Sequence, residues 1–164
     1  MQPFVITRVL DAPRELVWQA WTDFSHMEWL GPKGLTIHHA TSDLRPGGIF
    51  HYAMRTPDGR DMWGRWVIRE IDRPARLIFV NSFSDEAGGA TRHPMSADWP
   101  LEMLSTITFE EDGGKTMLTV EWLPLHPTDL ESKAFDEGRD SMRNGWGGSL
   151  DRLAEYLARA ARHQ

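Results

Sequence analysis

The sequence contains no cysteine, so neither a disulfide bond nor a thiolate metal site can form. No apolar run is long enough to span a bilayer, which excludes membrane insertion. The formal net charge of −6 argues against a nucleic-acid partner, because phosphate backbones require clustered lysine and arginine. The first ten residues contain no apolar block of the kind found in a signal peptide. Together these absences predict a cytoplasmic protein.

A length of 164 residues suits one domain, spanning residues 1–164, with enough chain to bury a hydrophobic core. Eight tryptophans and eight methionines are many for a chain of this length. They indicate either a bulky, closely packed core or a wide apolar cavity lined by large and adaptable side chains.

The spacing of apolar residues predicts a simple order of elements. The run PFVITRVLDA favours a first strand, and helical patterns follow at residues 13–23 and 26–30. The apolar period then changes to two, which predicts antiparallel strands at residues 35–44, 48–56, 62–72, 76–83, 101–110 and 115–123. A further helix is expected near Thr128, with Thr128 or Asp129 as its cap. Short turns between the strands favour a meander.

The C-terminal stretch at residues 140–164 predicts the longest helix. Its apolar residues recur at steps of three and four and share one face: Met142, Trp146, Leu150, Leu153, Leu157 and Ala160. Such a helix needs a partner surface. The predicted fold is therefore α+β, a curved antiparallel sheet of about six to seven strands wrapped around this helix, with two short helices after the first strand.

Three glycines, Gly145, Gly147 and Gly148, lie inside the predicted C-terminal helix. Each costs about 1 kcal/mol relative to alanine in a helix interior. They indicate either a kink or break in the helix, or a close approach of its backbone to the sheet or to a ligand.

Hairpin geometry predicts which strand residues face this helix. A tight turn at residues 45–48 pairs residues of the flanking strands and forms a bulky concave face: Ile37 with Met54, His39 with Tyr52, and Thr41 with Phe50. Later strands add apolar faces of their own, with Leu77, Phe79, Asn81 and Phe83, then Leu101, Met103, Ser105, Ile107 and Phe109, then Leu118, Val120 and Trp122.

The strand at residues 62–72 has two registers, because a slip of one residue exchanges its two faces. The preferred register directs Met62, Gly64, Trp66 and Ile68 inward, which keeps two arginines out of the core. The other directs Trp63, Arg65, Val67, Arg69 and Ile71 inward, where an arginine would anchor an acidic ligand.

Catalytic and metal-binding motifs are sparse. His38, His39 and His51 lie on adjacent predicted strands, but a third metal ligand cannot be placed and no HExxH spacing occurs. No phosphate-binding glycine loop is present. His39 and Tyr52 form either an acid–base pair or a structural pair in which each satisfies the other's hydrogen-bonding group. No catalytic residue, metal or cofactor is therefore assigned.

Several segments, taken in order, carry a resemblance: ITRVLDAPRELVWQAWTD, WLGP, DLRPGGIFHYAM, WVIREIDRPARLIFVNSFSDEAGG and GWGGSLDRLAEYLA. Together they resemble the Hsp90 ATPase activator homologue family, of the C-terminal-domain type, within the START-like or Bet v 1-like superfamily. The resemblance implies a helix-grip fold with a cavity between sheet and helix. It also implies hydrophobic ligands or, in some members, cyclase or hydrolase activity. The eukaryotic activator has an additional N-terminal domain for which this chain has no room, so direct action on an Hsp90-type chaperone is not expected.

Three functions follow from these observations. The first is binding of a small hydrophobic or amphipathic ligand by residues of the predicted cavity: His39, Phe50, Tyr52, Trp66, Phe79, Met103, Trp146 and Leu150. The second is an enzyme of the polyketide cyclase or hydrolase kind that uses His39 and Tyr52 with a loop residue: Asp85, Arg92 or His93. The third is a chaperone-associated protein-binding domain with an exposed apolar patch, marked by Trp63 or Trp99. The sequence leaves homodimer formation open.

Overall fold

The computed structural model describes residues 1–30 and 35–162. The chain begins with β1 (Phe4–Leu10), α1 (Arg14–Thr22) and the 3-10 helix η1 (Phe24–His26). The strands that follow are β2 (Thr36–Ser42), β3 (Ile49–Arg55), β4 (Asp61–Asp72), β5 (Arg76–Ser84), β6 (Ala90–Thr91), β7 (Met103–Asp112) and β8 (Lys115–Pro124). Helices α2 (Asp129–Glu137) and α3 (Arg139–Ala161) come last. The predicted order of elements is confirmed, and β6 is an addition within the predicted loop.

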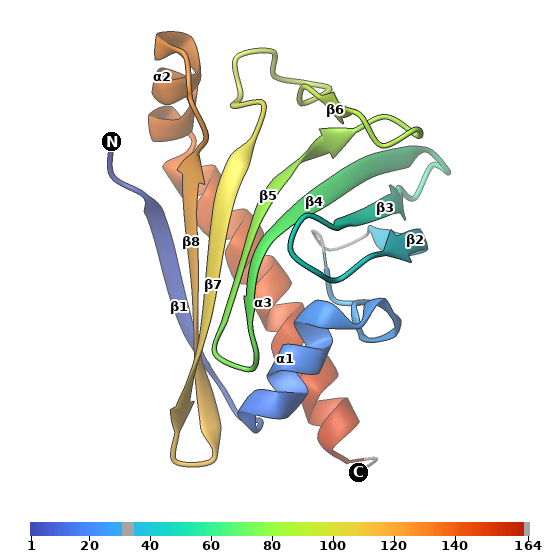
Figure 1. Ribbon diagram of the computed structural model, residues 1–164, viewed down its shortest axis with the longest axis vertical. Helices are drawn as coiled ribbons and strands as arrows, with labels where there is room; N and C mark the ends of the chain where they lie inside the picture. The colour runs from blue at the N-terminus through green and yellow to red at the C-terminus, as the bar shows by residue number, and fades with distance from the viewer. Residues whose placement is uncertain (31–34, 163–164) are drawn as a thin grey trace.

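All strand pairs are antiparallel and form an 8-stranded sheet in the order β1-β8-β7-β5-β4-β3-β2, with β6 paired to β5. Figure 1 shows the strands fanning out across α3, which runs diagonally along one face of the curved sheet. This is the predicted α+β helix-grip arrangement. Within the described ranges, no helix combines the length and the apolar character needed to cross a membrane.

The hydrophobic core lies between the concave face of the sheet and α3. Leu150, Leu153 and Leu157 of α3 are almost completely shielded from solvent. Helix α1 contacts α3, β7 and β8 and closes one end of the core. Its Trp18 packs edge-on against Phe109 of β7, with ring centroids 5.1 Å apart. One face of each helix is thus buried against the sheet, as the helical spacing predicts.

The pairing of β2 with β3 differs from the prediction after its first residues. Ile37 lies opposite Met54 as predicted, but a β-bulge then shifts the register by one residue. His39 is opposite Ala53, and Ala40 takes the place opposite Tyr52. The predicted pairs of His39 with Tyr52 and of Thr41 with Phe50 are therefore wrong. The physical reason is that one extra residue in a strand turns every following side chain to the other face.

The preferred register of β4 is confirmed. Gly64 lies opposite Tyr52 and Trp66 opposite Phe50, and both β4 residues are buried. A second bulge, between Ile68 and Glu70, then brings Ile71 opposite Leu77 and against the core. Of the residues that the alternative register directed inward, only Ile71, which follows the bulge, packs against the core.

Helix α3 runs without interruption through its three glycines. A Cβ atom added at Gly145, Gly147 or Gly148 would have no described atom within 4 Å, apart from the chain neighbours and local helix backbone. Among the described residues, the predictions of a helix break and of a close approach to the sheet are therefore wrong, and a close approach to a ligand stays a prediction.

Helix α2 is joined to the loop before β7 by one carboxylate. Thr128 caps the helix as predicted: its hydroxyl accepts a hydrogen bond from Glu131 N at 3.1 Å, and Glu131 Oε1 accepts one from Thr128 N at 2.9 Å. Glu131 Oε2 also accepts hydrogen bonds from Leu101 N at 2.8 Å and Arg92 Nη1 at 3.0 Å. Burial raises the pKa of Glu131, but these hydrogen bonds outweigh burial and lower it to about 2.

We predict that Gly145→Ala raises the free energy of unfolding by about 1 kcal/mol, because alanine is favoured in a helix interior and the added methyl group meets no described atom. Denaturant titration measures the change. Gly138→Ala is the matched control, because its Cβ would lie 2.8 Å from Trp99 Cζ3 and 3.2 Å from Ala134 O. That variant should be destabilised. A loss of stability in Gly145→Ala would contradict the open environment of this helix face.

We predict that Glu131→Gln lowers the free energy of unfolding at neutral pH by about 3 kcal/mol, the equivalent of a pKa drop from 4.5 to about 2. The folded-state pKa is depressed, so the carboxylate's contribution is complete above pH 4.5 and is lost as pH falls toward 2. The difference between wild type and variant should therefore shrink across this window. Denaturant titrations from pH 7 to pH 2.5 test this, and a difference that does not depend on pH would contradict it.

Candidate ligand-binding site

Aromatic rings from adjacent strands cover the concave face opposite the N-terminal half of α3. Trp66 of β4 is central: it stacks on Phe79 of β5 with ring centroids 4.1 Å apart and packs against Phe50 of β3 at 5.0 Å. Phe50 in turn stacks on Tyr52 at 5.0 Å. These side chains share a face because Phe50 lies opposite Trp66, and Tyr52 and Phe79 are two residues away along their strands from Phe50 and from Asn81, the residue opposite Trp66. The face thereby becomes a continuous wall of rings.

Tyr52 lies flat over Gly64 of the neighbouring strand. A Cβ atom at Gly64 would come within 2.6 Å of the Tyr52 hydroxyl oxygen, so only glycine leaves room for this ring. Burial raises the pKa of Tyr52 to about 12, and a hydrogen bond with the Trp66 side chain opposes part of that rise. The tyrosine is therefore a neutral hydroxyl at physiological pH.

Trp146 of α3 faces this wall from the helix side. Its ring stacks on Trp21 of α1, with centroids 6.0 Å apart and an interplanar angle of 16°. It also meets Trp122 of β8 edge-on at 5.3 Å. Leu150, one turn later on α3, is fully buried. Trp146 therefore lies where α1, α3 and the sheet meet.

Two neutral polar side chains interrupt the aromatic wall. Ser105 Oγ of β7 donates a hydrogen bond to Asn81 Oδ1 of β5 at 2.5 Å. Ser105 is completely buried and lies opposite Phe79, while Asn81 lies opposite both Trp66 and Met103. Buried polar groups in an apolar surrounding are the features that orient ligands in binding pockets.

Seven of the eight predicted ligand residues lie together between the sheet and α3: Phe50, Tyr52, Trp66, Phe79, Met103, Trp146 and Leu150. His39 does not. It is exposed, and its ring meets Trp63 edge-on at 5.6 Å on the convex side of the sheet. The bulge that follows Ile37 is the reason. Trp21, Asn81, Ser105 and Trp122 were not among the predicted site residues, although the alternating strand pattern already placed three of them on inward faces.

The acid–base pair needed for the predicted enzyme is absent, because His39 and Tyr52 lie on opposite faces of the sheet. The loop candidates do not join Tyr52 either. Asp85 Oδ1 accepts a hydrogen bond from Gly89 N at 2.8 Å, Arg92 pairs with Glu131, and the ring of His93 packs on Phe83. The enzyme hypothesis based on His39 and Tyr52 is therefore wrong.

The two tryptophans considered as markers of a protein-binding patch are both half-buried. Trp63 stacks on His51 of the neighbouring strand at 4.8 Å. Trp99 packs against Phe135 of α2, with ring centroids 6.3 Å apart. Among the residues that the structure describes, no group of three or more histidine, aspartate or glutamate side chains could hold a metal ion.

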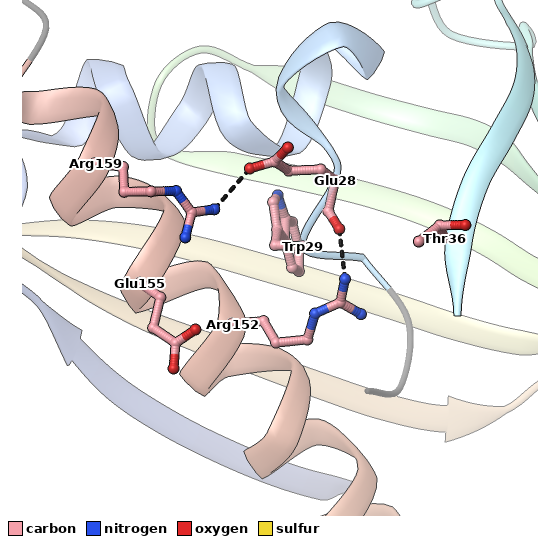
Figure 2. Close-up of a pocket in the computed structure, with 6 residues that line it drawn as sticks. All are labelled: Glu28, Trp29, Thr36, Arg152, Glu155 and Arg159. Carbon is pink, nitrogen blue, oxygen red and sulfur yellow. Dashed lines mark hydrogen bonds and ion pairs between the residues drawn. The ribbon is translucent and has the colours of Figure 1, made fainter. Parts of the chain in front are cut away.

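A polar pocket of about 230 Å³ lies beside α3, and none of the predicted ligand residues lines it. Figure 2 shows Arg152 and Arg159 reaching from α3 toward Glu28. Arg159 Nη2 lies 2.7 Å from Glu28 Oε1, and Arg152 Nη2 donates to Glu28 O at 2.7 Å. Trp29 forms part of the pocket wall. Its ring also packs against the ring of Trp21, with centroids 4.8 Å apart. These contacts tie the segment after η1 to α3.

Comparisons with known proteins agree with this architecture. A protein from Mycobacterium smegmatis has a solved structure with a TM-score of 0.70 and 28% identity, covering 93% of this chain and 88% of that one. The structure of an Arthrobacter aurescens protein has a TM-score of 0.77 and 25% identity, and the match covers 96% of this chain and 87% of that one. The structure of a Nitrosomonas europaea protein has a TM-score of 0.75 and 24% identity, and the match covers 98% of this chain and 97% of that one. The search of curated proteins found no match.

The family model described as Activator of Hsp90 ATPase homolog 1-like protein matches residues 11–158. This range includes α1, nearly the whole sheet and most of α3. The chain therefore belongs to the Activator of Hsp90 ATPase homolog 1-like family, within the START/Bet v 1-like superfamily, whose fold is that of a ligand-binding domain.

Proposed function

We propose that the protein binds a small hydrophobic or amphipathic ligand between the concave face of the sheet and the N-terminal half of α3. The observation that carries this proposal is the hydrogen bond between the fully buried Ser105 and the half-buried Asn81 within a wall of aromatic rings. A core that served only stability would be better filled by apolar side chains of similar volume at these positions. Apolar walls with a few buried polar groups are typical of pockets for small molecules.

Ligand entry requires a side chain to move, because the rings of the site contact one another. Trp146 is the side chain best placed to do so. It is half-buried, and it lies between Gly145 and Gly147, where the described residues leave open space. Rotation of Trp146 would break its contacts with Trp21 and Trp122.

A binding role suits the chemistry of the site better than catalysis. Proton transfer near neutral pH needs a group whose pKa lies near the working pH. Tyr52, with a pKa of about 12, is far from that range. The other polar groups at the centre of the site, Asn81 and Ser105, hydrogen-bond to each other. This arrangement can orient a ligand without transforming it.

We predict that the neutral fluorescent probe N-phenyl-1-naphthylamine binds the wild-type protein and brightens on binding, because an apolar wall of rings excludes water from it. Phe50→Leu should weaken this binding about fivefold to tenfold, since loss of one aromatic contact costs about 1 kcal/mol. Fluorescence titration measures both dissociation constants, at a temperature at which circular dichroism shows each variant to be folded.

The control for this titration is Trp63→Phe, which changes an aromatic residue on the convex side of the sheet. It should leave the dissociation constant unchanged. The proposal fails if the folded wild-type protein gives no probe signal, or if both substitutions weaken binding equally. Native mass spectrometry of the purified protein offers an independent check, because a tightly bound ligand would appear as an added mass.

A further inference from the structure

Three indole N–H groups in the candidate site have no hydrogen-bond acceptor among the described residues: those of Trp21, Trp122 and Trp146. Each indole nitrogen is shielded from solvent. Trp29 is different, because its Nε1 donates to Ala20 O at 2.8 Å. Buried donors nearly always find acceptors in folded proteins, so three exceptions in one place need an explanation.

The three unpaired donors belong to one cluster of rings. Trp146 touches both of the others, at 6.0 Å and 5.3 Å between ring centroids. Trp122 also lies opposite Ser105 on the neighbouring strand. The rings that carry these donors therefore gather where α1, α3 and β8 meet.

The surroundings of these donors contain little that could accept their protons. Ser105 and Asn81 hydrogen-bond to each other, and neither accepts a hydrogen bond from these three indole N–H groups. Apolar or neutral side chains of the core lie around them: Phe4, Phe50, Tyr52, Trp66, Phe79 and Met103. The guanidinium of Arg143 on α3, an exposed residue, lies over the Phe4 ring at 5.3 Å from its centroid. Arg65 of β4 points to the convex side, where it donates to Gly88 O at 3.0 Å and pairs with Glu102.

We infer that the ligand is an uncharged, flat molecule with a hydrogen-bond acceptor, such as a ketone or quinone oxygen, that pairs with the N–H group of Trp122 or Trp146. This inference rests on the proposed function. A flat ring system stacks favourably on the aromatic wall. A carboxylate or ammonium group would lose its hydration without gaining an opposite charge. An acceptor oxygen would instead satisfy donors that the fold leaves unpaired.

Three compounds of nearly equal size separate these possibilities: tetralin, 1-tetralone and tetralin-1-carboxylate. Isothermal titration calorimetry should show the ketone binding about fivefold to tenfold more tightly than the hydrocarbon, as expected for one additional hydrogen bond. The carboxylate should bind most weakly. Trp122→Phe and Trp146→Phe keep a ring but remove the N–H group. The double variant should bind ketone and hydrocarbon with equal affinity, whereas Trp29→Phe should keep the preference.

Two outcomes overturn the inference while leaving ligand binding intact. In one, wild type binds tetralin or the carboxylate as tightly as the ketone. In the other, the double variant keeps the full preference for the ketone. Absence of binding by all three compounds would count against the proposed function itself.

Thermal unfolding without ligand gives a second readout that does not depend on the probe. Trp29→Phe removes an N–H group that has a partner, whereas Trp146→Phe removes one that has none. The melting temperature should therefore fall further in Trp29→Phe. An equal or larger fall in Trp146→Phe would show that its N–H group is already satisfied, and would overturn the inference.

Discussion

Burial of one side of α3 against the concave face of the sheet is the interaction on which the rest of the structure depends. A helix with a single apolar face is stable only when that face is covered, and Leu150, Leu153 and Leu157 are covered almost completely. The sheet can cover them because it curves, and its order places β1 and β2 at opposite edges. The same curvature makes the inner surface concave, so the requirement that stabilises the fold also creates the candidate site.

The two halves of α3 meet this surface with different chemistry. The C-terminal half presents leucines, whose side chains contain no polar atoms and pack without any hydrogen-bonding requirement. The N-terminal half presents Trp146, whose ring contacts Trp21 and Trp122; the N–H groups of all three have no acceptor within residues 1–30 and 35–162. A core selected for stability alone would avoid such groups, because each unpaired buried donor costs about 1 to 3 kcal/mol. The cost falls where the N-terminal half of α3 meets α1 and β8.

Apolar periodicity was sufficient to predict the order of elements and the long final helix, because each depends on local spacing. Residue type limited the cap of α2 to Thr128 or Asp129, and the structure has Thr128. Periodicity also identified most of the candidate site, since alternation along a strand decides which residues face inward. His39 was misplaced because a β-bulge depends on how two strands fit together, which neither strand specifies by itself. The role of the α3 glycines was misjudged for a related reason: the space around a helix depends on its neighbours, and here the described residues leave space open.

The anchoring of α3 and its neighbours indicates where the site can open. At the start of α3, Arg139 donates to Gln2 O at 2.5 Å and to Pro3 O at 3.2 Å, which ties the helix to the chain just before β1. The preceding helix is held by Glu131, and the C-terminal half of α3 is held by its buried leucines and by the Arg159–Glu28 pair. Between these anchors lie Gly145, Gly147 and Gly148, the residues of α3 with the weakest intrinsic preference for a helix. A local rearrangement that admits a ligand therefore disrupts the fewest interactions at residues 145–148, the segment that carries Trp146.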